Sequence, residues 1–239
     1  MKIPEGKIID EIRAELSVLS DDTLRQSTQN FFKEKIQCYG IKTETVRKLG
    51  TAFFKKLKNL SKDEILALCD SLFQSGMLEE SIIACNWSYL LHNDYTPSDF
   101  EIFEKWVGQY ISNWASCDTL CNHTIGDFIQ LYPEYMKRLK KWATSENRWM
   151  RRASAVTLII PAKNGMFLDD VFEIAGKLLL GPDDLVQKGY GWMLKSAAAL
   201  HQEDVFNFIM KHKSQMPRTS LRYAIEKMPP ELRKKAMEN

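Results

Sequence analysis

The sequence has no long hydrophobic run, no signal region and an odd number of cysteines. Its longest apolar stretch, residues 153–162, is interrupted by Ser154, Thr157 and Pro161, and it is shorter than the roughly 20 apolar residues of a membrane-spanning helix. Residues 1–5 lack the apolar core of a secretory signal, which predicts a cytoplasmic protein. Five cysteines are spread along the chain, and this pattern predicts reduced thiols and no disulfide framework.

Strand-like alternation is also missing, whereas helical periodicity is present almost everywhere. Of the 239 residues, 44% are hydrophobic, enough to exclude a disordered chain and to form a large core. Apolar residues recur at spacings of three and four, as in the series Ile8, Ile12, Leu16 and Leu19. The sequence therefore predicts an all-α protein. Helix starts are expected at a capping box from Ser61 to Glu64, at Thr96-Pro97, and at Asp183 or Asp184.

Four segments share one character: each opens with polar or basic residues and then becomes small and apolar. They are residues 80–91, 118–128, 149–158 and 186–195. Their spacing of roughly 35 to 40 residues is close to the period of HEAT-type helix pairs. We therefore expect a single domain over residues 1–239, with an N-terminal helical cap at about 1–40. Its predicted fold is a curved superhelical stack of HEAT-like antiparallel helix pairs, an ARM/HEAT-type α-α solenoid.

The small net charge of +2 conceals a division of the chain into blocks. Residues 42–62, 137–152 and 211–235 each carry +6, which leaves −16 on the remainder. If the fold gathers these blocks on one face, they form a surface for a polyanion. Three separate solvated helix faces are the alternative.

Several motifs, in consistent order, resemble the AlkD-like DNA alkylation repair family over residues 10 to 230. They are Tyr-Gly-Ile-Lys-Thr at 39–43 followed by Val-Arg-Lys-Leu at 46–49, Asn-Trp-Ala-Ser-Cys-Asp at 113–118, Trp-Met-Arg-Arg-Ala at 149–153, Gln-Lys-Gly-Tyr-Gly-Trp-Met-Leu at 187–194, and Ser-Leu-Arg-Tyr-Ala-Ile-Glu-Lys at 220–227. The chain departs from the family's pattern at Asn113, where an aromatic residue is common, and at Lys42-Thr43-Glu44, where Thr-Pro is common.

The resemblance implies a C-shaped stack of HEAT-like helix pairs whose concave face holds double-stranded DNA. It also implies a monomeric glycosylase that releases cationic N3- and N7-alkylated purines from duplex DNA. The family uses no metal and no organic cofactor, and it implies no membrane partner. The localisation that it implies is cytoplasmic, on the nucleoid when the protein is bound to DNA. Trp114, Asp118 and Trp192 match the family's catalytic cleft, and Arg152 matches an arginine that holds the DNA backbone.

The residue types fit this chemistry. Cleavage of an N-glycosidic bond builds positive charge on the sugar, which a carboxylate such as Asp118 can stabilise while it positions water. Indole rings such as Trp114 and Trp192 attract cations. A core tryptophan followed by an acid in the first turn of a helix is the structural alternative.

Further residues are predicted to contact DNA. Arg148, Arg151 and Arg152 are spaced to share one helix face, and Lys188 and Lys195 bracket Trp192 at helical spacing. The other predicted DNA contacts are Phe31, Lys42, Arg47, Lys48 and Arg222.

Two alternative functions stay open: a non-catalytic relative that binds damaged or branched DNA, and a protein–protein scaffold. A zinc site at Cys117, Cys121 and His123 is disfavoured because no second ligand cluster accompanies it. Cys117 as a nucleophile is disfavoured because the sequence places no histidine to activate it.

Overall fold

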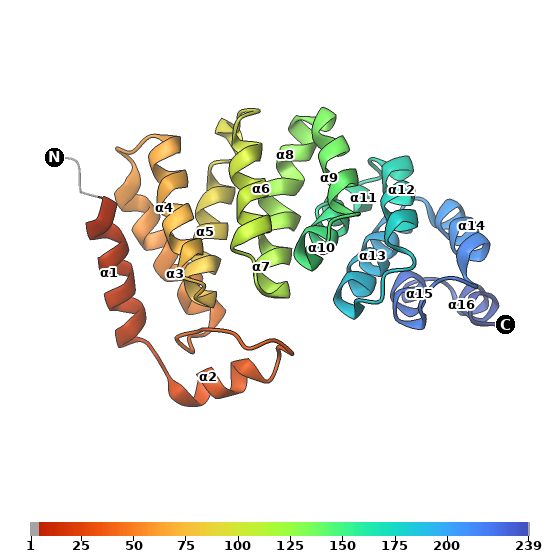
Figure 1. The fold of residues 1–239 in the computed structure, drawn as a ribbon, viewed down its shortest axis with the longest axis horizontal. Helices are drawn as coiled ribbons and strands as arrows, with labels where there is room; N and C mark the ends of the chain where they lie inside the picture. Colours follow the sequence, from red (N-terminus) through yellow and green to blue (C-terminus); the bar gives the residue numbers. More distant parts are fainter. Residues whose placement is uncertain (1–4, 239) are drawn as a thin grey trace. The chain divides into compact units, whose positions relative to one another are not determined.

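The computed structural model describes residues 5–238, and within them the architecture is all-helical (Figure 1). The described residues contain no β-strand, only an isolated bridge between Gln37 and Met77. The chain divides into two compact units, Met1–Leu120 and Cys121–Asn239, and each is described by itself. The all-helical, α-solenoid-like architecture confirms the predicted fold class, whereas the single domain stays a prediction.

The first unit is built on the central helix α5, against which α3, α4 and α7 pack. Trp87 of α5 is completely buried, and its indole nitrogen donates a hydrogen bond of 2.8 Å to the carbonyl of Gly50 in α3. The helices of this unit are α1 (Glu5–Val18), α2 (Asp22–Gln29), α3 (Thr43–Phe54), η1 (Lys55–Leu57), α4 (Lys62–Gln74), α5 (Leu78–Leu90), η2 (His92–Asp94), α6 (Asp99–Gln109) and α7 (Trp114–Thr119). A π-helix, η3 (Leu120–Ile125), follows α7.

The second unit is built on α13, which packs against α10, α11, α12 and α15. Gly191 allows α13 and α15 to touch, because a Cβ atom there would lie 2.8 Å from the carbonyl oxygen of Ser220 and 2.7 Å from the Cβ of Tyr223. The helices are α8 (Gly126–Leu131), η4 (Pro133–Tyr135), α9 (Met136–Trp142), α10 (Arg148–Val156), α11 (Ile159–Lys163), α12 (Leu168–Leu178), α13 (Asp184–Ala197), α14 (Gln202–His212), α15 (Arg218–Ile225) and α16 (Pro230–Met237).

Two of the predicted helix starts are confirmed and one is wrong. Ser61 forms the full capping box of α4, and the Asp183 side chain caps α13 by accepting from the amides of Leu185 and Val186. Pro97 is not at the first helical position of α6. Instead, the Asp99 carboxylate accepts from the Thr96 amide at 2.7 Å, which makes a turn before the helix begins.

The predicted apolar stripe of α1 ends one turn earlier than expected. Ile8, Ile12 and Leu16 are buried, but Leu19 lies beyond the helix and is exposed. Of the four repeated segments, residues 80–91, 149–158 and 186–195 fall mainly in α5, α10 and α13. The fourth, residues 118–128, runs from α7 through η3 into α8.

No helix of the described part of the chain is both long and apolar enough to cross a membrane.

Candidate functional site

Asn113 fixes the start of α7 and thereby the spacing of two predicted catalytic residues. Its side-chain oxygen accepts a hydrogen bond of 2.9 Å from the amide of Ser116, and the helix begins at Trp114. Asn113 is thus an N-cap, a task that an aromatic residue cannot perform. Because Trp114 and Asp118 are four residues apart in one helix, their side chains share a face.

The environment of this helix face is aromatic and mostly closed to water. Asp118 is 9% exposed, and Trp114 is half-buried. The ring of Phe32 stacks on the indole of Trp114 with centroids 5.3 Å apart and planes inclined by 24°. The neighbouring Phe31, which the sequence favoured as a DNA contact, is 75% exposed. The aromatic pair at 31–32 was visible in the sequence, but which ring meets Trp114 was not.

The N-terminal signature at Tyr39–Ile41 is an anchor that the sequence did not explain. The backbone amides of Tyr39, Gly40 and Ile41 donate hydrogen bonds of 2.9, 2.9 and 3.1 Å to the carboxylate of Glu79. Glu79 is 1% exposed and lies in the first turn of α5. Gly40 has a φ of +83°, and a Cβ atom there would lie 2.2 Å from the carbonyl oxygen of Asp21. The signature therefore fixes the segment that follows α2.

A second buried carboxylate completes this anchor. Glu80 accepts a hydrogen bond of 2.9 Å from the Tyr39 hydroxyl and pairs with Arg13 of α1 at 3.0 Å. Burial and the bond to Glu80 raise the pKa of Tyr39 to about 12. The Glu80 hydrogen bond also raises the pKa of Arg13, against the opposing effect of burial. Glu79 and Glu80 together join the 39–41 turn to α5, and Glu80 also joins α1 to α5. Sequence reasoning missed them because their partners lie far away along the chain.

In the second unit, Trp192 is half-buried on a face of α13 that carries two lysines at helical spacing. Both lysines have partners. Lys195 forms an ion pair of 2.9 Å with Glu226, and its ammonium lies 5.5 Å from the ring centre of Tyr223. Lys188 pairs more loosely with Asp184, at 3.5 Å. The face is therefore basic but partly neutralised.

The arginines of α10, which the sequence predicts to contact DNA, have partners within the protein. Arg148 makes a two-pronged ion pair with Asp183, with distances of 2.7 and 2.9 Å. Burial raises the pKa of Asp183, but its bonds to Arg148 and to backbone amides outweigh this, so the net pKa is lowered. Arg151 donates to the carbonyls of Ser145 and Glu146.

Arg152, the predicted backbone contact, is 5% exposed. Its guanidinium donates to the carbonyl of Leu185 and lies 3.5 Å from the Cβ position of Gly189, so it packs against α13. All three arginines of α10 therefore bind protein groups. Their role toward DNA stays a prediction.

Two basic hollows contain other predicted contacts. On α3, Arg47 and Lys48 line a surface hollow of about 340 Å³ together with Lys55, and Lys48 pairs with Glu44 at 2.7 Å. Lys42, directly before this helix, is exposed.

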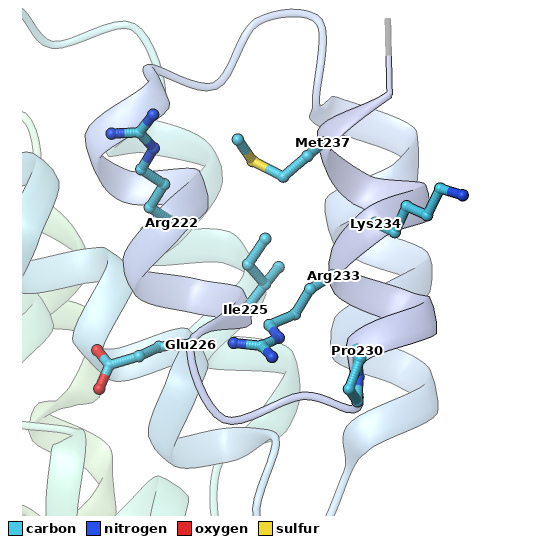
Figure 2. A pocket seen from close by; sticks show the side chains of 7 residues that line it. All are labelled: Arg222, Ile225, Glu226, Pro230, Arg233, Lys234 and Met237. Carbon is cyan, nitrogen blue, oxygen red and sulfur yellow. The ribbon is translucent and has the colours of Figure 1, made fainter.

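Figure 2 shows the second hollow, of about 420 Å³, between α15 and α16. Its floor contains Ile225 and Met237. Arg222 comes from α15, and Arg233 points from α16 toward Glu226, whereas Lys234 points away. Among the described residues, the only acid lining this hollow is Glu226, and it is paired with Lys195. The charge of the hollow is therefore mainly that of its arginines.

The cysteines are all buried and none forms a disulfide. Cys117 and Cys121 lie in the interior, whereas His123 is exposed. Within residues 5–238 no group of three histidine, cysteine or acidic side chains is arranged to hold a metal ion.

Burial raises the pKa of the Cys69 and Cys85 thiols, which keeps them protonated and unreactive. We expect Ellman's reagent to label essentially none of the five cysteines in the native protein and all five after unfolding in guanidinium chloride. Rapid labelling of a thiol in the folded protein, measured by absorbance, would contradict the buried positions.

The fold and these residues define a class of protein: an all-helical, α-solenoid-like protein with a tryptophan and an acid on one face of a helix and with clusters of basic residues. The profile of the DNA alkylation repair enzyme family matches residues 12–228, and the chain belongs to this family. The family places the protein in DNA alkylation repair, with DNA as its substrate or partner.

A solved structure shows the same fold. It is described as a predicted DNA alkylation repair enzyme from Enterococcus faecalis, and it is similar to this chain with a TM-score of 0.79 at 15% sequence identity. The similarity covers 88% of this chain and 97% of the other. A comparison with curated proteins gave no significant match.

Proposed function

We propose that the protein is a DNA glycosylase of base excision repair, which hydrolyses the N-glycosidic bond of cationic N3- and N7-alkylated purines in duplex DNA. The observation that carries this proposal is the position of Asp118. Its carboxylate is nearly withdrawn from water and shares a helix face with Trp114. Membership of the DNA alkylation repair enzyme family supplies the substrate class.

The proposed reaction needs one carboxylate. As the bond between sugar and base breaks, its electron pair neutralises the cationic base, and the positive charge passes to the sugar. Asp118 stabilises this charge, and a site with little water strengthens the interaction. Asp118 also orients the water that attacks the sugar and accepts the proton that this water loses. An alkylated purine already carries its charge, so no acid is required for its departure, and we propose no metal or organic cofactor.

The tryptophans are proposed to assist in different ways. Stacking on Phe32 holds the Trp114 indole in one plane before DNA arrives, which avoids an ordering cost on binding. Its ring attracts a cationic sugar by roughly 0.5 to 2 kcal/mol. Trp192 is proposed to contact DNA from the basic face of α13, between Lys188 and Lys195.

Basic residues in both units are proposed to bind phosphates of double-stranded DNA. In the first unit these are Lys42, Arg47 and Lys48, and in the second they include Arg222 and the arginines of α10. Such contacts hold the backbone without reading its sequence. We propose that the protein acts as a monomer in the cytoplasm, on the nucleoid when it is bound to DNA.

Release of a free base tests the proposed reaction. Duplex DNA treated with a methylating agent is incubated with the purified protein, and free 7-methylguanine and 3-methyladenine are measured by mass spectrometry. Release above the spontaneous rate supports a glycosylase. Tight binding without release would support the non-catalytic alternative instead. If the protein did not bind DNA at all, the protein–protein scaffold would be the remaining alternative.

Salt dependence tests the phosphate contacts. We expect Arg47→Ala to weaken binding to all duplex sequences alike and to reduce the slope of log affinity against log salt by about one. The control is Lys7→Ala, which removes a charge from an exposed position of α1 in the same unit. This variant should leave the slope unchanged. Fluorescence anisotropy at several salt concentrations gives both slopes. An unaltered slope for Arg47→Ala would remove α3 from the interface.

A further inference from the structure

The hollow between α15 and α16 combines positive charge with an apolar wall (Figure 2). Its apolar side chains are Ile225, Pro230 and Met237. Arg222 comes from α15 and Arg233 from α16, so both helices contribute a cation. The volume of about 420 Å³ lies within the range of roughly 300 to 1,000 Å³ that is typical of ligand pockets. The hollow therefore has room for a bulky apolar group.

The two helices that form this hollow are held in place within the second unit. The turn between them contains Pro229 and Pro230, whose rings fix the backbone angle φ. At the other end of α16, the Lys213 ammonium donates to the carbonyl oxygens of Lys235 and Glu238 at 3.4 and 2.8 Å. The hollow is therefore formed before a ligand arrives, and this reduces the ordering cost of binding.

The arginines of the hollow are not neutralised by the described part of the chain. Glu226, which also lines the hollow, forms its ion pair with Lys195 at 2.9 Å. No ion pair joins Arg222 or Arg233 to an acidic side chain within residues 5–238. Both arginines are exposed, and the surrounding residues 211–235 carry +6. A ligand that complements this surface is therefore acidic.

We propose that the hollow binds a short acidic segment of another protein. One apolar side chain of the segment packs against Ile225 and Met237, and a carboxylate beside it accepts the paired hydrogen bonds of the Arg233 guanidinium. Arg222 adds positive charge from the opposite helix. This interaction goes beyond the proposed function and does not depend on it.

The apolar wall favours a peptide over DNA as the ligand of this hollow. A phosphate backbone would satisfy the arginines, but it carries no apolar side chain and would leave Met237 and Pro230 in contact with water. A peptide with an apolar residue between acids matches both parts of the surface. Arginines beside an apolar pocket are also typical of protein–protein interfaces, where they are among the residues that contribute most to affinity.

A labelled peptide tests the proposed site. The probe is the peptide Asp-Glu-Asp-Phe-Asp-Glu-Asp with fluorescein at its N-terminus, and fluorescence anisotropy measures its affinity for the whole protein. We expect the same peptide with alanine in place of phenylalanine to bind about tenfold more weakly, because it leaves the apolar wall uncovered. Arg233→Ala should weaken binding of the phenylalanine peptide about tenfold. Its affinity for duplex DNA should be unchanged, because Arg233 is not a predicted DNA contact.

The matched control is Lys211→Ala, which removes an exposed cation of α14 from the same basic block but not from the hollow. This variant should bind both peptides like the unmodified protein. Thermal unfolding of both variants should be unchanged, because both side chains are exposed.

Three results would overturn the proposed site. They are equal binding of the two peptides, no binding of either peptide, and an Arg233→Ala variant that loses affinity for DNA but not for the peptide. The last result would assign the hollow to the DNA-binding surface. The rate of base release is measured separately, so none of these results affects the proposed glycosylase.

Discussion

Replacing Asp118 with asparagine is expected to reduce the release of 7-methylguanine by about 10² to 10³, the range seen when one group that stabilises transition-state charge is removed. Asparagine keeps the size of the side chain but carries no negative charge, so the developing positive charge on the sugar loses its partner. It also accepts no proton from the attacking water. The measurement is the single-turnover rate of base release from methylated duplex DNA.

The same variant should bind DNA at least as well as the unmodified protein, because the removed charge repels phosphates. Asp63→Asn serves as the control, since Asp63 is an exposed acid in the first turn of α4 in the same unit. Its rate of release should match that of the unmodified protein. If Asp118→Asn kept full activity while its thermal unfolding was unchanged, the catalytic role of this carboxylate would be disproved.

Replacing Glu79 with alanine is expected to cause the largest loss of stability. Three backbone amides, those of Tyr39, Gly40 and Ile41, donate to its carboxylate in a buried position. Each unsatisfied buried donor costs about 1 to 3 kcal/mol, so we expect a loss of roughly 3 kcal/mol or more if little water enters. Hydrogen exchange of a peptide covering residues 36–42 measures the effect at the three amides, and thermal unfolding measures it globally.

Two further variants distinguish the loss of these hydrogen bonds from the loss of a negative charge alone. Glu79→Gln retains one acceptor oxygen and should be intermediate in stability. Glu44→Ala removes an exposed acid of α3 and should change stability by less than about 0.5 kcal/mol. If the 36–42 peptide of Glu79→Ala exchanged as slowly as in the unmodified protein, the anchoring role would be refuted.

Local features were predictable because their causes lie within a few residues. The spacing of apolar residues predicted an all-α chain, and it did so because a helix repeats its faces every three to four positions. Ser61 and Asp183 were recognisable as caps for the same reason: a side chain at the start of a helix reaches amides two or three residues ahead.

Features that join distant segments were not predictable. Glu79 meets residues 38 to 40 positions earlier, and no local pattern marks such a pairing. The stack of Phe32 on Trp114 is of the same kind. The bond from the Arg152 guanidinium to the carbonyl of Leu185 is another example, because it depends on the packing of α10 against α13.

The close contact at Gly191 limits the movement of α13 relative to α15. With no side chain between them, α13 and α15 meet almost backbone to backbone, and the ion pair between Lys195 and Glu226 joins α13 to the end of α15. Trp192 and Arg222 are therefore carried on one stiff block. A DNA strand that contacted both residues would therefore meet side chains whose helices keep a fixed separation, and the second unit would bind it without closing around it.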